Sequence, residues 1–339
     1  MRLGRWFAPV CMTTGLGSLG IPAVAQQMPE ASDPVALLQR ISGAPRNLNY
    51  AGTFTHYSQE VSTSSRITHI YDKGDEWEKL ESVDGPRQEI IRRNDEMYCY
   101  QPDSKTVRVD KRLTGKFFPA LINGSPELVL ANYNLKLGQV ERIGGHDCQW
   151  VILEPKDALR FLQKLCAEIT SGLVLRAKTI NDRKQVVEQF TFTQLTIGKQ
   201  ALKDAVGGHI KSRLKLKEEG WRTDDSAQRG VKQAETGWTV ANPPAGFKMV
   251  MELKRTMSGK NEPVSHLVYS DGVASISVFI EPLNGGAAGF TKAAEDGMVS
   301  YAMRALPSHQ ITALGEVPLV ATQALAGGVS AKAVRPPGL

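Results

Sequence analysis

Apolar and polar side chains alternate with a period of two through most of the segment from 49 to 198. Short turns rich in Gly, Pro, Asn and Asp separate the first alternating runs, which cover 50–58, 66–72, 76–83, 87–93, 96–102 and 105–112. The pattern resumes at 149–155, 158–166, 172–180 and 186–197. A period of two marks strands, and turns this short join antiparallel neighbours. We therefore predict one large antiparallel sheet.

Helical patterns precede and interrupt this sheet. Asp33 can cap a helix that starts at Pro34, whose apolar residues recur on one side. Gly43 and Pro45 are expected to end that helix. A second short helix is predicted over 125–133, where a serine precedes a proline at the first helical position.

A smaller unit with mixed elements begins at 237. Its strands are predicted at 247–255, 265–272, 274–282 and 310–316, and its helices around 297–306 and from 318 to 329. The predicted fold class is therefore α+β, with a large antiparallel sheet and a few helices followed by a smaller α+β domain.

Residues 1–25 have the three parts of a secretory signal peptide. Arg2 and Arg5 make the start positive, an apolar run follows, and small residues precede a cleavage site between Ala25 and Gln26. We therefore expect an exported protein, and neither its location nor any motif favours a nucleic-acid partner. Loss of the two signal arginines reduces the net charge from +6 to +4, which suits an anionic surface or an acidic partner.

The expected organisation is a signal peptide at 1–25, a first domain at 30–198, a linker at 199–236, a second domain at 237–330 and a flexible tail at 331–339. The linker is polar and contains a candidate basic strip on one face of an extended segment, formed by Lys211, Arg213, Lys215 and Lys217. This strip either binds phosphates or acidic side chains, or is a solvated edge that discourages aggregation.

The mature chain keeps Cys99, Cys148 and Cys166. An oxidising compartment allows one disulfide and leaves one thiol over. The runs on either side of a turn at 156–158 are interpreted as paired strands, and in that register Cys148 and Cys166 lie opposite each other on one face. The alternative is two buried free thiols, because a register slip of about two residues would separate them.

The sequence contains no recognisable catalytic or metal-binding motif. The histidines are scattered, and the mature chain has neither a nucleophile–base motif nor a phosphate loop. Ser270-Asp271-Gly272 lacks the companion motifs that a catalytic Ser-Asp element requires. Asp-Gly is a favoured hairpin dipeptide and alternating apolar residues follow it, so we interpret these residues as the turn before a strand. We expect no enzymatic activity and no cofactor.

Several stretches resemble one family. VDGPRQEIIRR at 83–93, followed by EMYCYQPDSK, is similar to the first domain of the MucB/RseB proteins. SHLVYSDGVASISVFIEP at 265–282 and ALGEVP at 313–318 resemble the second domain of the same family, and the motifs occur in the same order. The resemblance extends from Leu37 to Val329, nearly the whole mature chain.

The resemblance implies a periplasmic negative regulator of an extracytoplasmic sigma factor of the sigma-E/AlgU type. Such a protein binds the periplasmic segment of an inner-membrane anti-sigma factor of the MucA/RseA type, shields it from proteolysis, and senses lipid or lipopolysaccharide in envelope stress. The first domain is then expected to be a half-closed sheet, similar to LolA and LolB, around an apolar cavity. The alternative is a periplasmic lipid or lipoprotein carrier of the LolA type, although such carriers lack the second domain.

Two sets of site residues follow from this resemblance. The candidate wall of the lipid cavity is Phe54, Tyr98, Tyr100, Phe117, Phe118, Leu121 and Tyr133. The alternative for each of them is ordinary core, since buried aromatic residues usually only pack. The candidate partner-binding region is Tyr269, Ser270, Asp271, Gly272 and Phe279. The sequence leaves open which lipid is sensed and whether the chain forms homo-oligomers.

Overall fold

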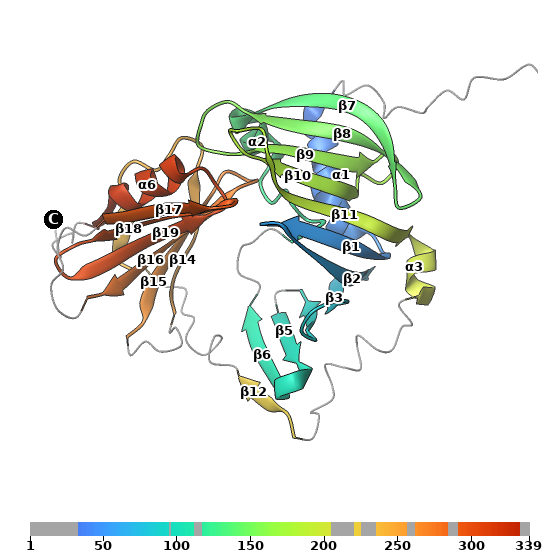
Figure 1. The fold of residues 1–339 in the computed structure, drawn as a ribbon, viewed down its shortest axis with the longest axis horizontal. Helices are drawn as coiled ribbons and strands as arrows, with labels where there is room; N and C mark the ends of the chain where they lie inside the picture. Colours follow the sequence, from blue (N-terminus) through green and yellow to red (C-terminus); the bar gives the residue numbers. More distant parts are fainter. Residues whose placement is uncertain are drawn as a thin grey trace, which may run out of the picture.

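A computed structural model of the chain describes residues 33–94, 96–111, 117–204, 220–224, 235–255, 262–283 and 291–332. These residues form a large sheet, a smaller sheet and a two-stranded ribbon, with a few helices packed against them (Figure 1). The predicted α+β class, dominated by antiparallel sheet, is confirmed.

The large sheet has 12 strands in the order β12-β6-β5-β4-β3-β2-β1-β11-β10-β9-β8-β7. Neighbours run antiparallel except β12 and β6, and the sheet is open because β12 and β7 occupy its two edges. Its strands are β1 (Tyr50–Ser58), β2 (Val61–Asp72), β3 (Asp75–Ser82), β4 (Glu89–Arg93), β5 (Glu96–Gln101), β6 (Thr106–Lys111), β7 (Tyr133–Ile143), β8 (His146–Pro155), β9 (Leu162–Glu168), β10 (Val174–Ile180), β11 (Val186–Ile197) and β12 (Arg222–Asp224). A 3-10 turn, η1 (Pro102–Ser104), joins β5 to β6.

The large sheet curls at its β7 end. The imidazole Nε2 of His146, at the start of β8, hydrogen-bonds the backbone carbonyl of Leu195 on β11 at 3.1 Å. The turn between β7 and β8 therefore reaches across to β11 and makes one face of the sheet concave. We call this face, which packs against the helices, the inner face.

Two helices pack against the inner face and contribute to the core of the first domain. In α1 (Pro34–Asn47), the Asp33 carboxylate accepts hydrogen bonds from the first turn, as predicted. The helix continues through Gly43 and Pro45, so the predicted end was wrong. Ala44 and Pro45 are both buried, and tertiary burial here outweighs the helix-breaking tendency of proline. The predicted Ser125 cap is confirmed in α2 (Pro126–Asn132).

The smaller sheet has the order β14-β15-β16-β19-β18-β17. Its strands are β14 (Lys248–Arg255), β15 (Val264–Ser270), β16 (Ser275–Pro282), β17 (Thr291–Asp296), β18 (Val299–Ala305) and β19 (His309–Gly315), and α6 (Leu319–Gly328) packs against it. The helix predicted around 297–306 was wrong, because this segment forms β18. Buried Ser300 and Ala302 alternate with more exposed neighbours, and the Ser300 hydroxyl lies 3.1 Å from the Thr322 hydroxyl of α6.

Short elements occur where a polar linker was expected. They are α3 (Lys199–Asp204) and β12, which extends the large sheet beside β6. A ribbon of β13 (Trp238–Val240) and β20 (Val329–Ala331) joins the start of the second domain to its end. Three predicted features lie outside the described residues. They are the cleavage site (Ala25 and Gln26), the basic strip (Lys211, Arg213, Lys215 and Lys217) and nearly all of the predicted tail.

Candidate functional site: an apolar inner face and the turn that closes it

Four phenylalanine rings occupy the middle of the inner face. Phe54 comes from β1, Phe190 and Phe192 come from β11, and Phe118 comes from the segment between β6 and α2. The centroid of the Phe118 ring lies 5.1 Å from that of Phe54, 5.1 Å from that of Phe190 and 4.9 Å from that of Phe192. Aromatic pairs at such distances add about 0.5–1.5 kcal/mol to the effect of burying their area.

Residues 117–124, which we call the strap, cross the inner face. The Arg92 guanidinium of β4 lies 3.9 Å from the centroid of the Phe117 ring at the start of the strap. Farther along, Leu121 and Ile122 share a cavity wall with Leu165 of β9 and other residues. The strap therefore covers apolar surface from β4 to β9.

Beneath the strap the described residues enclose a small cavity, with a volume of about 10 Å³. It is lined by Leu121, Ile122, Gln163, Leu165, Ala177, Thr179, Glu188, Phe190 and Val273. That volume corresponds to about one water molecule, whereas pockets for small ligands typically measure about 300–1,000 Å³. The apolar inner face is therefore present but closed at this point.

The cavity has a polar margin on one side. The Thr179 hydroxyl donates a hydrogen bond to Gln163 Oε1 at 3.0 Å, and His56 Nε2 lies 2.9 Å from Glu188 Oε1. The His56 ring also stacks on Phe190, with centroids 4.2 Å apart. His56 is partly exposed whereas Glu188 is buried, so polar groups separate the apolar surface from solvent here.

The predicted cavity wall divides between the two faces of the sheet. Phe54, Phe118, Leu121 and Tyr133 belong to the core on the inner face, and Phe117 begins the strap. Residues that pair directly across neighbouring strands lie on the same face of the sheet. The inner face therefore includes the paired series Gly52, Ile67, Leu80, Ile90 and Cys99. Because side chains alternate along β5, Tyr98 and Tyr100 point to the opposite face, where they pack with Trp77 and Ile91. Their assignment to the inner-face wall was wrong.

The Ser-Asp-Gly turn lies at the junction of the two domains. Ser270 pairs with Ser275 across the hairpin of β15 and β16, so the predicted turn is confirmed. The Asp271 Oδ1 atom accepts hydrogen bonds from two backbone amides of its own turn, Val273 N at 2.9 Å and Ala274 N at 2.6 Å. Its Oδ2 atom accepts from Arg160 Nε at 2.8 Å and from the Tyr133 hydroxyl at 3.0 Å. One carboxylate therefore shapes the turn and also joins the two domains.

Arg160 is the central first-domain residue of this junction, and sequence reasoning did not identify it. Its side chain is fully buried, and besides Asp271 it donates to the Asp157 carboxylate at 2.5 Å and the Ala245 carbonyl at 2.6 Å. Burial and the Asp271 carboxylate raise the pKa of the adjacent Tyr133 hydroxyl well above its ordinary value. Tyr133 therefore remains a proton donor. An arginine within the apolar run 158–166 was the available signal, because such a buried charge needs a partner.

The burial of this turn changes the interpretation of the candidate partner-binding region. Tyr269, Ser270, Asp271 and Gly272 are all buried, and Asp271 is 0% exposed. They contact the protein's own first domain and core, and therefore offer no free surface to another protein in this arrangement. Phe279 differs, because it is only partly buried.

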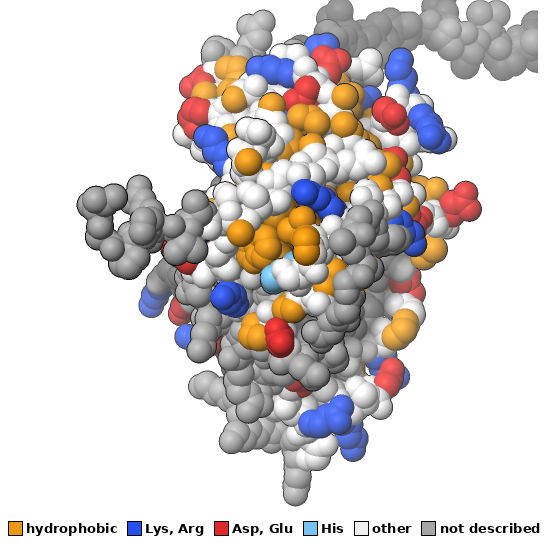
Figure 2. All heavy atoms as spheres, turned by 90° about the vertical axis from the view of Figure 1, so that its left-hand side faces the viewer, with side chains coloured by type: hydrophobic (Ala, Val, Ile, Leu, Met, Phe, Trp, Pro, Cys, Tyr) orange, Lys and Arg blue, Asp and Glu red, His pale blue; other side chains and the backbone are white. Residues whose placement is uncertain are grey.

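Phe279 lies on the face of the smaller sheet that points away from α6. It stacks on His266, with ring centroids 4.3 Å apart. His266 is buried, neither of its ring nitrogens has a hydrogen-bond partner within the described structure, and burial followed by the nearby Arg255 lowers its pKa to about 4. Leu314, in the same face, is 40% exposed. Figure 2 shows hydrophobic side chains gathered near the middle of the side of the molecule that the second domain forms.

A disulfide joins Cys148 and Cys166, with the two Cα atoms 5.3 Å apart. The predicted register was wrong by two residues, because Cys148 pairs with Glu168 and Cys166 pairs with Trp150. The cysteines are diagonal neighbours on the outer face, and sheet twist brings one diagonal close enough for a bond. The register differs because β9 begins at Leu162, whereas the strand was predicted to begin at 158.

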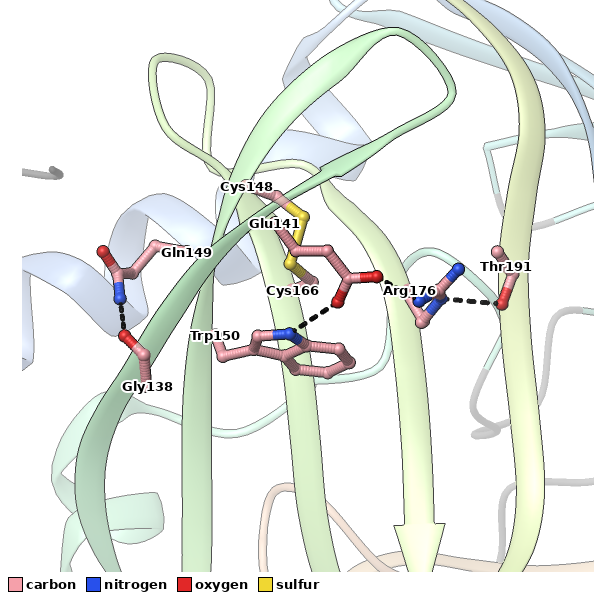
Figure 3. Close-up of a disulfide and its surroundings, with 8 residues drawn as sticks. All are labelled: Gly138, Glu141, Cys148, Gln149, Trp150, Cys166, Arg176 and Thr191. Carbon is pink, nitrogen blue, oxygen red and sulfur yellow. Dashed lines mark hydrogen bonds and ion pairs between the residues drawn. A yellow bond between two sulfur atoms is a disulfide. The ribbon is translucent and has the colours of Figure 1, made fainter. Parts of the chain in front are cut away.

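A polar network lies beside this disulfide (Figure 3). The Glu141 carboxylate accepts a hydrogen bond from Trp150 Nε1 at 2.9 Å and forms an ion pair with Arg176. Arg176 also donates to the Thr191 hydroxyl at 3.2 Å. The network therefore links strands β7, β8, β10 and β11 on the outer face of one domain.

The described part of the chain contains no group of three or more His, Cys, Asp or Glu side chains that could hold a metal ion. Among its helices, none has the length and apolar character needed to span a bilayer. What the arrangement does provide is apolar surface, a closed cavity and a buried charged junction, which are suited to binding and conformational change.

Two family models match the chain one after the other. The model of the MucB/RseB N-terminal domain matches residues 33–211, and the model of the MucB/RseB C-terminal domain matches residues 232–330. Together they cover the smaller sheet and all of the large sheet except β12.

Individual proteins are also similar over most of their length. The chain is 28% identical over 313 residues to the sigma factor AlgU regulatory protein MucB of Pseudomonas aeruginosa, covering 90% of this chain and 92% of that protein. It is 25% identical over 320 residues to the sigma-E factor regulatory protein RseB of Escherichia coli, covering 92% of this chain and 93% of that protein. A solved complex of Pseudomonas aeruginosa MucA/MucB has 25% identity and a TM-score of 0.68, covering 89% of this chain and 100% of that one.

Proposed function

This chain belongs to the MucB/RseB family, and on that premise we propose that it is a periplasmic, non-enzymatic regulator of a sigma factor. In this proposal it binds the periplasmic segment of an inner-membrane anti-sigma factor of the MucA/RseA type and shields that segment from proteolysis. Lipid, including lipopolysaccharide, weakens the complex during envelope stress.

The observation that carries the proposal is the match of both domains, in order, to one family of regulators. Relatives named as sigma factor regulatory proteins align over nine-tenths of the chain, and a similar structure was solved as a MucA/MucB complex. A simple carrier would need only the first domain, whereas here the turn of the second domain is built into the first.

The lipid response is supported by the chemistry of the inner face. Phe54, Phe118, Phe190 and Phe192 present the kind of apolar surface that acyl chains require, and a polar margin adjoins it at His56. The same surface also favours the second candidate, a lipid or lipoprotein carrier of the LolA type.

Calorimetric titration separates these functions. The mature protein is titrated with the periplasmic segment of the anti-sigma factor encoded in the same genome, with and without lipopolysaccharide. A regulator binds the segment and releases it with lipid, and the bound segment resists cleavage by the catalytic domain of the membrane-anchored protease. Lipid binding without any binding of the segment would instead support the carrier.

The partner surface is tested at Phe279. We consider the face of the smaller sheet that points away from α6 and carries Phe279. If this face contacts the anti-sigma segment, Phe279→Ser weakens binding by about tenfold, the equivalent of about 1.4 kcal/mol. Tyr57→Ser is the matched control, since Tyr57 is an aromatic residue of the first domain that is 39% exposed. Equal affinity of the two variants and the wild type would place the interface elsewhere.

A further inference from the structure

The hairpin of β15 and β16 inserts its turn into the first domain. Val273 is 4% exposed and belongs to the core of the first domain, although the chain places it in the second. It also lines the small cavity beneath the strap, beside Leu121 and Phe190. One wall of the closed inner face is therefore supplied by the other domain.

The same turn holds one end of the strap. The Gly272 carbonyl accepts hydrogen bonds from Asn123 N at 2.9 Å and Gly124 N at 3.0 Å. A Cβ atom added to Gly124 would lie 2.4 Å from the Cα of Gly272, so the two backbones meet where only glycine fits. Because strap and turn are joined in this way, the strap cannot lift at this end without breaking the contacts with the turn.

The buried charges of the junction favour separation of the two domains in a single step over the loss of one charged partner at a time. Asp271 and Arg160 are both fully buried, one on each side of the boundary. Removing one partner from such a pair leaves a buried charge without that partner and is strongly destabilising, whereas the net contribution of an intact pair is small, because desolvation offsets attraction. Separation of the domains returns both charges to water together, so it avoids the penalty of the unpaired charge.

We propose that the turn at 271–274 is a plug, and that entry of an acyl chain onto the inner face and docking of the two domains exclude each other. A cavity of about 10 Å³ admits no acyl chain, and enlarging it beside Val273 displaces the turn. By linkage, a ligand that binds only the undocked form shifts the population toward that form. This inference rests on the lipid response in the proposed function and specifies how that response reaches the second domain.

A second contact between the domains allows a direct test. Gln59 Nε2, in the turn between β1 and β2, donates to the Asp296 carbonyl at 3.3 Å. A Cβ atom on Gly297 would lie 2.9 Å from Gln59 Cγ, so cysteines at both positions come within reach of a disulfide. The double variant Gln59→Cys/Gly297→Cys can therefore tether the domains when oxidised and release them when reduced.

The probe is a dansyl-labelled fatty acid, whose fluorescence is titrated against the mature protein. We expect the oxidised double variant to bind it about tenfold more weakly than the wild type or worse, and reduction to restore binding. Gly297→Cys alone controls for the left-handed backbone at that position, where φ is +61°. Wild-type protein in the same reductant controls for loss of the Cys148–Cys166 bond. Binding to the oxidised form that matches the wild type would overturn the plug.

A second variant tests the plug by weakening the docking of the two domains instead of fixing it. Asp271→Asn keeps a side-chain oxygen for the two amides of the turn but loses the carboxylate oxygen that faces Arg160 and Tyr133. We expect tighter binding of the probe, by about fivefold or more, and a larger radius of gyration in solution scattering. Asp147→Asn is the control, because that carboxylate is 56% exposed in its pair with Arg142. Unchanged affinity in Asp271→Asn, with the fold intact, counts against the plug.

Failure of the plug and failure of the proposed function give different results. If wild type, the reduced double variant and Asp271→Asn all bind neither the probe nor lipopolysaccharide, the lipid response itself is wrong and the plug is overturned with it. If all forms bind lipid equally, including the oxidised tether, the lipid response stands and the plug alone is overturned. Binding of the anti-sigma segment is measured separately by calorimetry in each case.

Discussion

The protein contains two arginine–carboxylate contacts of similar chemistry in very different surroundings. Arg160 and Asp271 are completely buried at the junction of the domains, whereas Arg176 and Glu141 are 23% and 39% exposed on the outer face of the first domain. The first pair joins residues 111 apart in the sequence and the second joins residues 35 apart.

The difference shows that burial, and not the type of contact, decides what an ion pair does for this fold. Around Glu141, water can replace a lost partner, so the contact adds little to the free energy of unfolding. Asp271 is 0% exposed, so a lost partner leaves a buried polar group unsatisfied. The buried pair therefore specifies one arrangement of the two domains, whereas the exposed pair contributes locally to one sheet.

The largest effect is expected from breaking the buried pair on one side. Asp271→Ala should lower the free energy of unfolding by about 3–5 kcal/mol, because it leaves the buried Arg160 with the Asp157 carboxylate alone and removes the acceptor of the Tyr133 hydroxyl and of two turn amides. Urea denaturation at neutral pH measures this change, with Asp147→Ala as an exposed control. A loss as small as that of the control would mean that water reaches Arg160.

The disulfide stabilises the first domain by a covalent bond that is independent of both ion pairs. Cys148→Ser/Cys166→Ser should lower the free energy of unfolding by about 3 kcal/mol, since the bond closes a loop of moderate length in the unfolded chain. The sequence separation is 18 residues. The comparison of urea denaturation curves for the double variant and the wild type, both without reductant, measures the effect. Identical midpoints would contradict it.

A buried histidine makes the stability of the second domain depend on pH. Because the pKa of His266 is lowered from 6.5 to about 4, the unfolded chain binds the proton more readily than the folded protein. Its contribution is present above pH 6.5 and is lost as the pH falls from 6.5 towards 4, by an amount on the order of 3 kcal/mol.

The free energy of unfolding is measured at several pH values from about 7 to about 4, a range that contains both the unfolded and the folded pKa of His266. His266→Leu should have a shallower pH dependence than the wild type over that window, because it has no proton to bind. Equal slopes for the two proteins would show that other groups dominate acid destabilisation.

The smallest effect is expected at the exposed pair. Glu141→Gln should change the free energy of unfolding by only about 0.2–1 kcal/mol, and the change should shrink further at high salt. Trp150 fluorescence reports the substitution directly, because the indole Nε1 donates to this carboxylate. A loss comparable to that of Asp271→Ala would remove the distinction between buried and exposed pairs.

Much of the fold was predictable because it depends on local patterns. The period-two runs located most strands, and Ser125 and Asp33 marked two helix starts. Errors arose where burial decided the outcome. Ser300 and Ala302 lie in a strand because small residues are needed beneath α6, and α1 continues through Pro45 because its last turn is buried.

The candidate site was less predictable, for a related reason. Of the candidate cavity wall, Phe54 and Phe118 lie on the inner face whereas Tyr98 and Tyr100 do not, since only strand register decides which face a residue occupies. The contact between Arg160 and Asp271 could not be derived from spacing, because it forms between two domains.

By itself, the sequence determined the types of most elements, the two-part organisation, the turn at Ser270–Gly272 and the family resemblance, because these are carried by residues close together in the chain. Only the tertiary structure decided that the turn enters the first domain, that Asp271 pairs with Arg160 and that the inner face is closed. These features depend on which surfaces exclude water together, and that is a property of the assembled fold.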